Sequence, residues 1–261
     1  MTRGFGSTAA FSHTAADYAA TMAPALLPVA KEVIRRAELR SGETVLDVGT
    51  GTGTAAWLAL GEGRRVIGLD AAAGMLDIAR REVPQAELIE ADFTSIPLDD
   101  GWVDVLLAVH ALLFASDRVA ALREWLRVTA PGGRMSLSVP GPGNVVPSAV
   151  FGAVYDRYDI EWHADDYPRT SQLADWAGDA GWREVGTDAD ATAGISLADE
   201  TAFRAWLRVG RMASDWPPER IDAFALDLMA VCPRATDGSF RIPFGAQYLT
   251  ARKPAERSGS H

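Results

Sequence analysis

The chain has 261 residues, 48% of them apolar, which is enough to bury the core of one elaborated α/β domain. It carries 25 basic and 35 acidic residues, and the formal net charge of −10 argues against nucleic acid and against an anionic membrane surface as partners. Cys232 is the single cysteine, which excludes an intrachain disulfide framework and a cysteine-ligated zinc site.

The N-terminal region, residues 1–23, is small and polar with scattered aromatic side chains, which is typical of a mobile arm or a short lid helix. It has no apolar segment of the kind found in a secretory leader. The longest apolar stretch runs from Val103 to Ala115, is interrupted by His110, and is too short to cross a bilayer. We therefore expect a soluble cytoplasmic protein that does not bind membranes.

Helices and strands alternate after this arm, beginning with helical spacing from Pro24 to Leu39. The apolar runs that predict strands are Thr44–Val48, Arg65–Leu69, Glu87–Glu90, Val103–Val109 and Arg134–Val139. The segments between them with helical spacing are Thr54–Leu60, Met75–Arg81 and Arg118–Thr129. This alternation predicts a parallel sheet with helices on both faces.

The stretch Pro140-Gly-Pro-Gly-Asn144 breaks regular structure. The elements predicted beyond it are two helical pieces within 147–180, a sixth strand starting at 182–185, amphipathic helices at 199–214 and 217–231, and a final strand at 240–251.

The segment Val45-Leu-Asp-Val-Gly-Thr-Gly-Thr-Gly53 is the most informative in the chain. An apolar run ends in an acid, and glycines then occupy every second position. Because glycine lacks a Cβ, the backbone can turn sharply there and a ligand can lie against it. The helix that follows offers free N–H groups at its start. Such a turn at the carboxyl end of a parallel strand is where open α/β sheets bind nucleotides.

Two nucleotide chemistries compete for this loop. The G-x-G-x-x-A spacing from Gly51 to Ala56 fits the pyrophosphate of a dinucleotide. The fuller D-x-G-x-G-x-G pattern from Asp47 to Gly53 fits an amino-acid tail, whose ammonium the acid attracts. In this pattern the chain resembles the class I S-adenosylmethionine (SAM)-dependent methyltransferases, and residues 24–252 follow that family's order of parts.

The resemblance implies a Rossmann-like sheet of seven strands, mostly parallel, with the last strand antiparallel between the fifth and sixth, and with a helical cap. It divides the chain into an arm or lid (1–23), a SAM-binding core (24–146), the remaining strands with the inserted cap (147–252), and a tail (253–261). Within the family, the chain is similar to the group that includes ubiquinone, menaquinone and natural-product methyltransferases.

The same resemblance implies the cofactor site. Asp70, which ends the second strand, accepts from ribose hydroxyls, although an acid there also suits a helix N-cap. Met75 packs against adenine or belongs to the core. Asp92 reads the adenine amine or simply forms a turn. The implied cofactor-binding residues are Asp47, Gly49, Thr50, Gly51, Gly53, Asp70, Ala71, Met75, Ala91, Asp92, Phe93 and Val109.

His110 follows the fourth strand and is the candidate catalytic residue, as a general base or as a binding contact. Relatives often carry a histidine pair slightly later, where this chain has Leu113 and Phe114. The candidate substrate residues lie in the N-terminal arm and in the predicted cap, namely Tyr18, Tyr155, Trp162, His163 and Trp206. Aromatic side chains at helical spacing also suit ordinary core packing, and this alternative stays open. No set of residues has convincing metal-ligand spacing.

The sequence thus predicts transfer of a methyl group from SAM to an oxygen, nitrogen or carbon atom of a small, bulky apolar or aromatic metabolite. Three alternatives stay open: a SAM-binding enzyme of the same fold that catalyses a non-methylating cyclisation, a non-catalytic SAM-binding protein, and an NAD-dependent oxidoreductase. The oligomeric state is not predicted.

Overall fold

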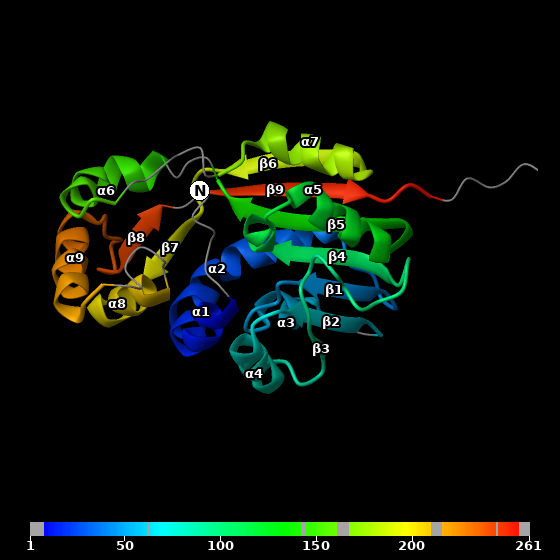
Figure 1. The fold of residues 1–261 in the computed structure, drawn as a ribbon, viewed down its shortest axis with the longest axis horizontal. Coiled ribbons are helices and arrows are strands. Elements are labelled where there is room, and N and C mark those ends of the chain that lie inside the picture. The colour runs from blue at the N-terminus through cyan, green and yellow to red at the C-terminus, as the bar shows by residue number, and fades with distance from the viewer. Residues whose placement is uncertain are drawn as a thin grey trace, which may run out of the picture.

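A seven-stranded sheet lies at the centre of the protein (Figure 1). The computed structural model describes residues 8–61, 63–141, 145–160, 167–209, 216–243 and 245–255. The strand order is β3-β2-β1-β4-β5-β9-β6. The first five strands are parallel: β1 (Thr44–Val48), β2 (Arg65–Asp70), β3 (Glu87–Glu90), β4 (Val103–Val109) and β5 (Thr129–Pro140).

The last strand, β9 (Ala246–Arg252), runs antiparallel between β5 and β6 (Arg183–Asp190). The family resemblance implied this place and direction for the last strand, and the expected fold class is confirmed. Residues of β1 such as Val45 and Leu46 point to opposite faces and are both fully buried. A strand buried on both faces requires helices on both sides of the sheet.

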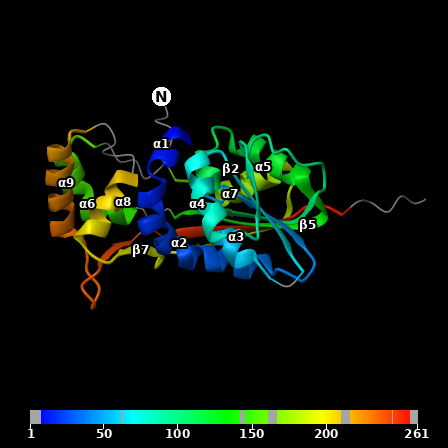
Figure 2. The same ribbon diagram turned by 90° about the horizontal axis from the view of Figure 1, so that it is seen from below.

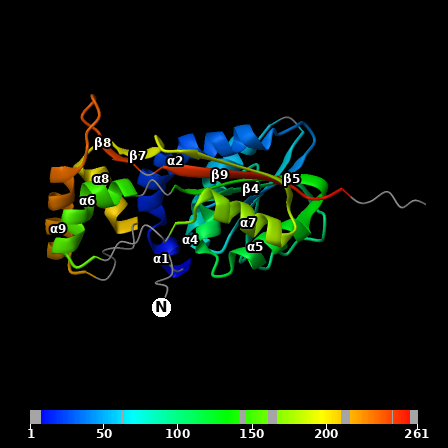
Figure 3. The same ribbon diagram turned by 90° about the horizontal axis from the view of Figure 1, so that it is seen from above.

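Two helical layers cover the sheet (Figures 2 and 3). On one face lie α5 (Arg118–Val128) and α7 (Thr170–Ala180), and on the other lie α2 (Ala15–Ala37) and α3 (Thr54–Ala59). A further helix, α4 (Ala73–Glu82), packs beside β2 and β3.

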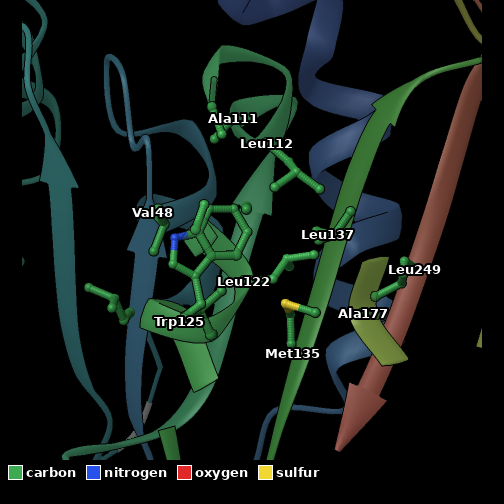
Figure 4. Packing of buried hydrophobic residues seen from close by; sticks show 14 of the residues in the cluster. Val48, Ala111, Leu112, Leu122, Trp125, Met135, Leu137, Ala177 and Leu249 are labelled. Carbon is green, nitrogen blue, oxygen red and sulfur yellow. The ribbon is translucent and has the colours of Figure 1, made fainter. Parts of the chain in front are cut away.

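Figure 4 shows the packing under α5, where Trp125 points at the sheet. The indole of Trp125 is fully buried, and its Nε1 donates to the carbonyl of Phe93, 3.0 Å away.

A separate apolar cluster forms the cap. It contains α6 (Val145–Arg157), α8 (Glu200–Val209), α9 (Pro218–Val231) and a two-stranded antiparallel sheet of β7 (Gly194–Leu197) and β8 (Phe240–Pro243). Its centre is aromatic, with Phe203 in edge contact with Phe240 at 4.9 Å between ring centroids. The cap therefore has a core of its own beside the main sheet.

The single final strand predicted over 240–251 was wrong. The structure divides this stretch into β8, which belongs to the cap, and β9, which belongs to the main sheet. Pro243 has no backbone N–H to continue the pairing of β8, and Gly245 follows with a φ of 60°. The chain turns at these residues and passes from one sheet to the other.

The predicted start of the first core helix at Pro24 was also wrong. A short helix, α1 (Thr8–His13), precedes α2, and α2 continues through both Pro24 and Pro28. Each proline removes one backbone hydrogen bond from the helix. Apolar residues on α2, such as Val29 and Val33, are buried against the sheet, and this packing outweighs the lost bonds.

Within the described part of the chain, no helix has the length and apolar character needed to span a membrane.

An ion pair at the end of the sheet away from the glycine loop joins three elements. The guanidinium of Arg134, on β5, donates to both carboxylate oxygens of Glu43 at 2.8 and 2.9 Å. It also donates to the carbonyls of Ala37 and Glu38, where α2 ends. Only 9% of the Arg134 side chain is exposed, so these bonds are shielded from solvent. Arg134 thus fixes the end of α2 and the residue before β1 to β5.

We expect Arg134→Ala to lower the free energy of unfolding by about 3–5 kcal/mol, because it leaves a largely buried carboxylate without its partner. Urea denaturation measures the change. The control is Arg65→Ala, which breaks a half-exposed pair with Glu87 and is expected to cost less than about 1 kcal/mol. Equal losses in the two variants would contradict the structural role given to Arg134.

Candidate functional site

A pocket lies at the carboxyl end of β1, beneath the first half of α2. The loop after β1, the start of α3, the end of β4 and one face of α2 form its walls. The lining residues are Tyr18, Ala23, Leu26, Ala30, Asp47, Gly49, Thr50, Thr52, Thr54, Ala55 and Val109. The glycine loop singled out in the sequence is therefore the floor of a pocket, and α2 is its roof.

Glycine is required at the three positions of the loop for different structural reasons. All have positive φ, at 67° for Gly49, 56° for Gly51 and 91° for Gly53. A Cβ on Gly49 would lie 2.6 Å from the Cβ of Ala111, and one on Gly53 would lie 2.6 Å from Val83. At Gly51 the nearest atom to such a Cβ is a ring carbon of Tyr18, 3.9 Å away. Gly49 and Gly53 allow close packing, whereas Gly51 leaves bare main chain facing the roof.

Asp70 fastens this loop to the end of β2. Its Oδ2 accepts from the N–H of Gly51 and its Oδ1 from the N–H of Ala72, both at 2.8 Å. One residue earlier in the loop, the N–H of Thr50 donates to the carbonyl of Leu69 at 2.9 Å. The N-cap of α4 is Ala72, so the reading of Asp70 as a helix N-cap was wrong.

Asp47 has a carboxylate oxygen with no partner. Its Oδ2 accepts from the hydroxyl of Thr50 at 2.7 Å, but its Oδ1 is buried and unbonded. Burial raises the pKa of Asp47 to about 7 and the nearby charge of Asp70 adds to the rise, while the Thr50 hydroxyl and the N–H of Ala56 oppose it. An acceptor that is buried and unsatisfied in a pocket wall suits a cationic donor from a ligand.

Tyr18 covers the loop from above. Burial and the neighbouring carboxylates of Asp70 and Asp47 raise the pKa of its phenol well above the ordinary value, so the hydroxyl stays protonated. Beside it, Met75 is buried in a small cluster with Ala15 and Ala72, and Ala71 is half-buried. The candidate residues that follow β1 and β2 thus gather under the first turns of α2.

The turn after β3 adjoins the end of β2, because the N–H of Ala91 donates to the carbonyl of Asp70. Asp92 is exposed, and its Oδ1 accepts from the N–H and the hydroxyl of Thr94 at 2.8 and 2.6 Å. Asp92 therefore shapes a turn, and its Oδ2 is not engaged in these bonds. Phe93 packs against the main core in edge contact with Trp125.

His110 follows Val109 at the end of β4, where the short helix η1 (Ala111–Phe114) begins. Its φ is 59°, and its Nδ1 lies 3.3 Å from the hydroxyl of Ser138. Burial lowers the pKa of His110 to about 4. The imidazole is thus neutral near pH 7 and weakly basic.

The candidate substrate residues are dispersed. Tyr155 and Trp206 are buried in the aromatic core of the cap, with 2% and 8% exposure, and neither lines the pocket. Trp162 and His163 lie outside the described residues. Of this group, Tyr18 is the one that lines the pocket.

Sequence reasoning missed the residues that α2 contributes to the roof. Ala23, Leu26 and Ala30 line the pocket at spacings of three and four residues along this helix. The sequence analysis assigned the residues at this spacing to the core and ended the N-terminal arm at residue 23. Helical periodicity that continues on the N-terminal side of Pro24 is the feature that could have identified them.

Comparison with known proteins agrees with this geometry. The profile of a family described as a methyltransferase domain matches residues 46–137, from β1 into β5. A malonyl-[acyl-carrier protein] O-methyltransferase of Yersinia pestis is 35% identical over 61% of this chain and 58% of its own length. A demethylmenaquinone methyltransferase of Beutenbergia cavernae is 33% identical over 56% of this chain and 68% of its own.

Among solved structures, the [4+2]-cyclase SpnF superposes with a TM-score of 0.59 over 88% of this chain and 81% of its own, at 21% identity, which shows a shared fold. The chain spans somewhat less than two thirds of the length of the Yersinia relative. The profile match, the relatives and the fold agree, and the chain belongs to the family of class I SAM-dependent methyltransferases.

Proposed function

We propose that this protein transfers a methyl group from SAM to a small-molecule acceptor, and that SAM binds in the pocket above the glycine loop. The observation that carries the proposal is the buried Oδ1 of Asp47, which has no hydrogen bond and belongs to a residue that lines the pocket. A pyrophosphate would bring negative charge to this carboxylate, whereas an ammonium group satisfies it. The pocket therefore favours an amino-acid tail over a dinucleotide.

The other candidate residues take roles around that tail. Asp70 already holds the loop and retains lone pairs for ribose hydroxyls. In the proposal, Met75 and Ala71 contact the adenine, and Asp92 and Phe93 of the neighbouring turn read its polar edge. The cofactor-binding role of these residues follows the family resemblance, and their placement along one edge of the sheet supports it.

Bound SAM supplies an electrophilic methyl group, so the protein's own contribution is alignment and the exclusion of water. We propose that Tyr18 and the roof of α2 exclude water above the loop. His110 stays neutral and is weakly basic, so we propose that it contacts the acceptor and does not remove its proton.

We further propose that the chain divides into a lid within residues 1–23, a cofactor core at 24–146, a segment at 147–252 that holds the remaining sheet strands and the inserted cap that receives the acceptor, and a tail at 253–261. The net charge of −10 and the aromatic character of the cap favour an uncharged or apolar metabolite over nucleic acid.

The function is tested in two steps. Thermal shift with SAM, S-adenosylhomocysteine and NAD identifies the ligand, and we expect the first two to raise the melting temperature. Transfer of labelled methyl to a panel of phenols, amines and quinols then tests catalysis. Stabilisation by NAD alone rejects the proposal, and product formation without label transfer indicates a non-methylating reaction.

Asp70→Ala is expected to weaken SAM binding by about 1.5–3 kcal/mol, roughly a 10- to 150-fold rise in Kd, because the loop loses its tie to β2 and the ribose loses an acceptor. Isothermal titration calorimetry measures this change. Asp77→Ala removes an exposed acid on α4 that pairs with Arg80, and it is the matched control. An unchanged Kd in Asp70→Ala would refute the ribose assignment.

The raised pKa of Asp47 predicts opposite pH dependences for stability and for binding. Without ligand, the folded state holds this proton more tightly than the unfolded chain, so the free energy of unfolding falls as the pH rises from about 4 to about 7. An ammonium group binds the carboxylate form, so the affinity for SAM rises with pH and levels off above about 7.

Titrations of Kd and of urea stability across this range measure both slopes. In Asp47→Asn we expect weaker binding of SAM and a flat pH profile. A wild-type affinity that does not change across the range would show that Asp47 does not meet the ammonium.

A further inference from the structure

One ion pair joins the roof of the pocket to the cap. The guanidinium of Arg208, on α8, donates from Nε to Oδ2 of Asp17 at 2.7 Å and from Nη2 to Oδ1 at 3.2 Å. Asp17 lies on the first turn of α2. Among the residues that the structure describes, no other ion pair connects α1 or α2 with the cap.

Asp17 is adjacent to Tyr18, and the two side chains leave the helix in different directions. Asp17 faces α8 in the cap, whereas Tyr18 lies over Gly51 and near the carboxylates of Asp47 and Asp70. Both belong to the same helical turn, which the bond from the Thr21 hydroxyl to the carbonyl of Asp17 also supports, at 2.6 Å. The position of Asp17 relative to the cap therefore determines the position of Tyr18 above the loop.

The helix α1, which precedes α2, packs against α4 and η1. Phe11, on α1, meets Phe114 of η1 edge to face at 5.2 Å. The N–H of Gly74 donates to the hydroxyl of Ser12 at 3.3 Å, and a Cβ on Gly74 would lie 2.4 Å from the carbonyl oxygen of Ser12. α1 thus contacts the elements that follow β2 and β4, and the ion pair of Arg208 with Asp17 connects the start of α2 with the cap.

Two prolines lie inside α2, between Tyr18 and the part of the helix that is buried against the sheet. Pro24 and Pro28 have no N–H to donate to the preceding turn, so the helix is held less firmly there than elsewhere. On the far side of the prolines, Val29 and Val33 are buried against the sheet.

We propose that Arg208 is a positioning residue for the cofactor pocket. Through Asp17 it holds Tyr18 against the glycine loop and so slows the release of the bound adenosyl ligand. It thereby makes the cap, the side of the molecule that receives the acceptor, part of the closure over the cofactor. This inference rests on the proposed function, because it takes the pocket to be the SAM site.

The test compares two arginines of the same helix. Arg204 lies one turn before Arg208, and its partners, Glu200 and Asp222, both belong to the cap. We expect Arg208→Gln to release tritiated S-adenosylhomocysteine about two- to five-fold faster than wild type, the range for a half-exposed pair. We expect Arg204→Gln to match wild type. Dissociation is followed by filter binding after dilution into excess unlabelled S-adenosylhomocysteine.

Two further measurements separate positioning from a general loss of structure. The charge-reversed double variant Asp17→Arg with Arg208→Asp restores the pair and is expected to restore slow release. Salt screens a half-exposed pair, so release from wild type accelerates with ionic strength, whereas release from Arg208→Gln changes much less.

Equal release rates from wild type, Arg208→Gln and Arg204→Gln would overturn the role of Arg208, as would equal acceleration in both single variants. Failure of the reversed pair to restore slow release would also overturn it. If wild type itself binds no S-adenosylhomocysteine, the proposed function fails first.

Discussion

The site depends on one carboxylate that ties two strand ends together. Asp70 accepts the N–H of Gly51 from the loop after β1 and the N–H of Ala72 from the start of α4. These two bonds set the path of the glycine loop and the direction in which α4 leaves β2. Without them, the positive φ at Gly51 would not place bare main chain under the roof of the pocket. The pocket is thus a consequence of how two neighbouring parallel strands end.

Asp70 stabilises the loop, whereas Asp47 destabilises the folded chain. A buried carboxylate with one unbonded oxygen is unfavourable for the folded chain, and its raised pKa expresses that penalty. The same oxygen lies in the pocket wall and has no hydrogen bond within the described fold, so a ligand can donate to it. Polar groups left unsatisfied at a binding site are a common form of stored strain.

Local patterns in the sequence predicted the parts of the fold that local physics determines. The run before Asp47 and the glycines after it identified β1, the turn and α3, and the order of apolar segments predicted the sheet. The sequence did not predict the bounds of an element, or the sheet that a strand joins, where tertiary contacts determine them. α2 passes through Pro24 because Val29 and Val33 are buried, and Phe240 enters a second sheet because the cap offers it an aromatic partner in Phe203. The unbonded oxygen of Asp47 depends on neighbours that no local pattern encodes.

The place of β9 has a consequence for how the chain is made. β6 has no neighbour in the sheet until β9 inserts between it and β5, and residues 191–245 separate these two strands in the chain. During translation, β9 must emerge from the ribosome before β6 can join the sheet. The nascent chain therefore carries an open edge on β5, the kind of surface that chaperones protect, through the whole synthesis of the cap.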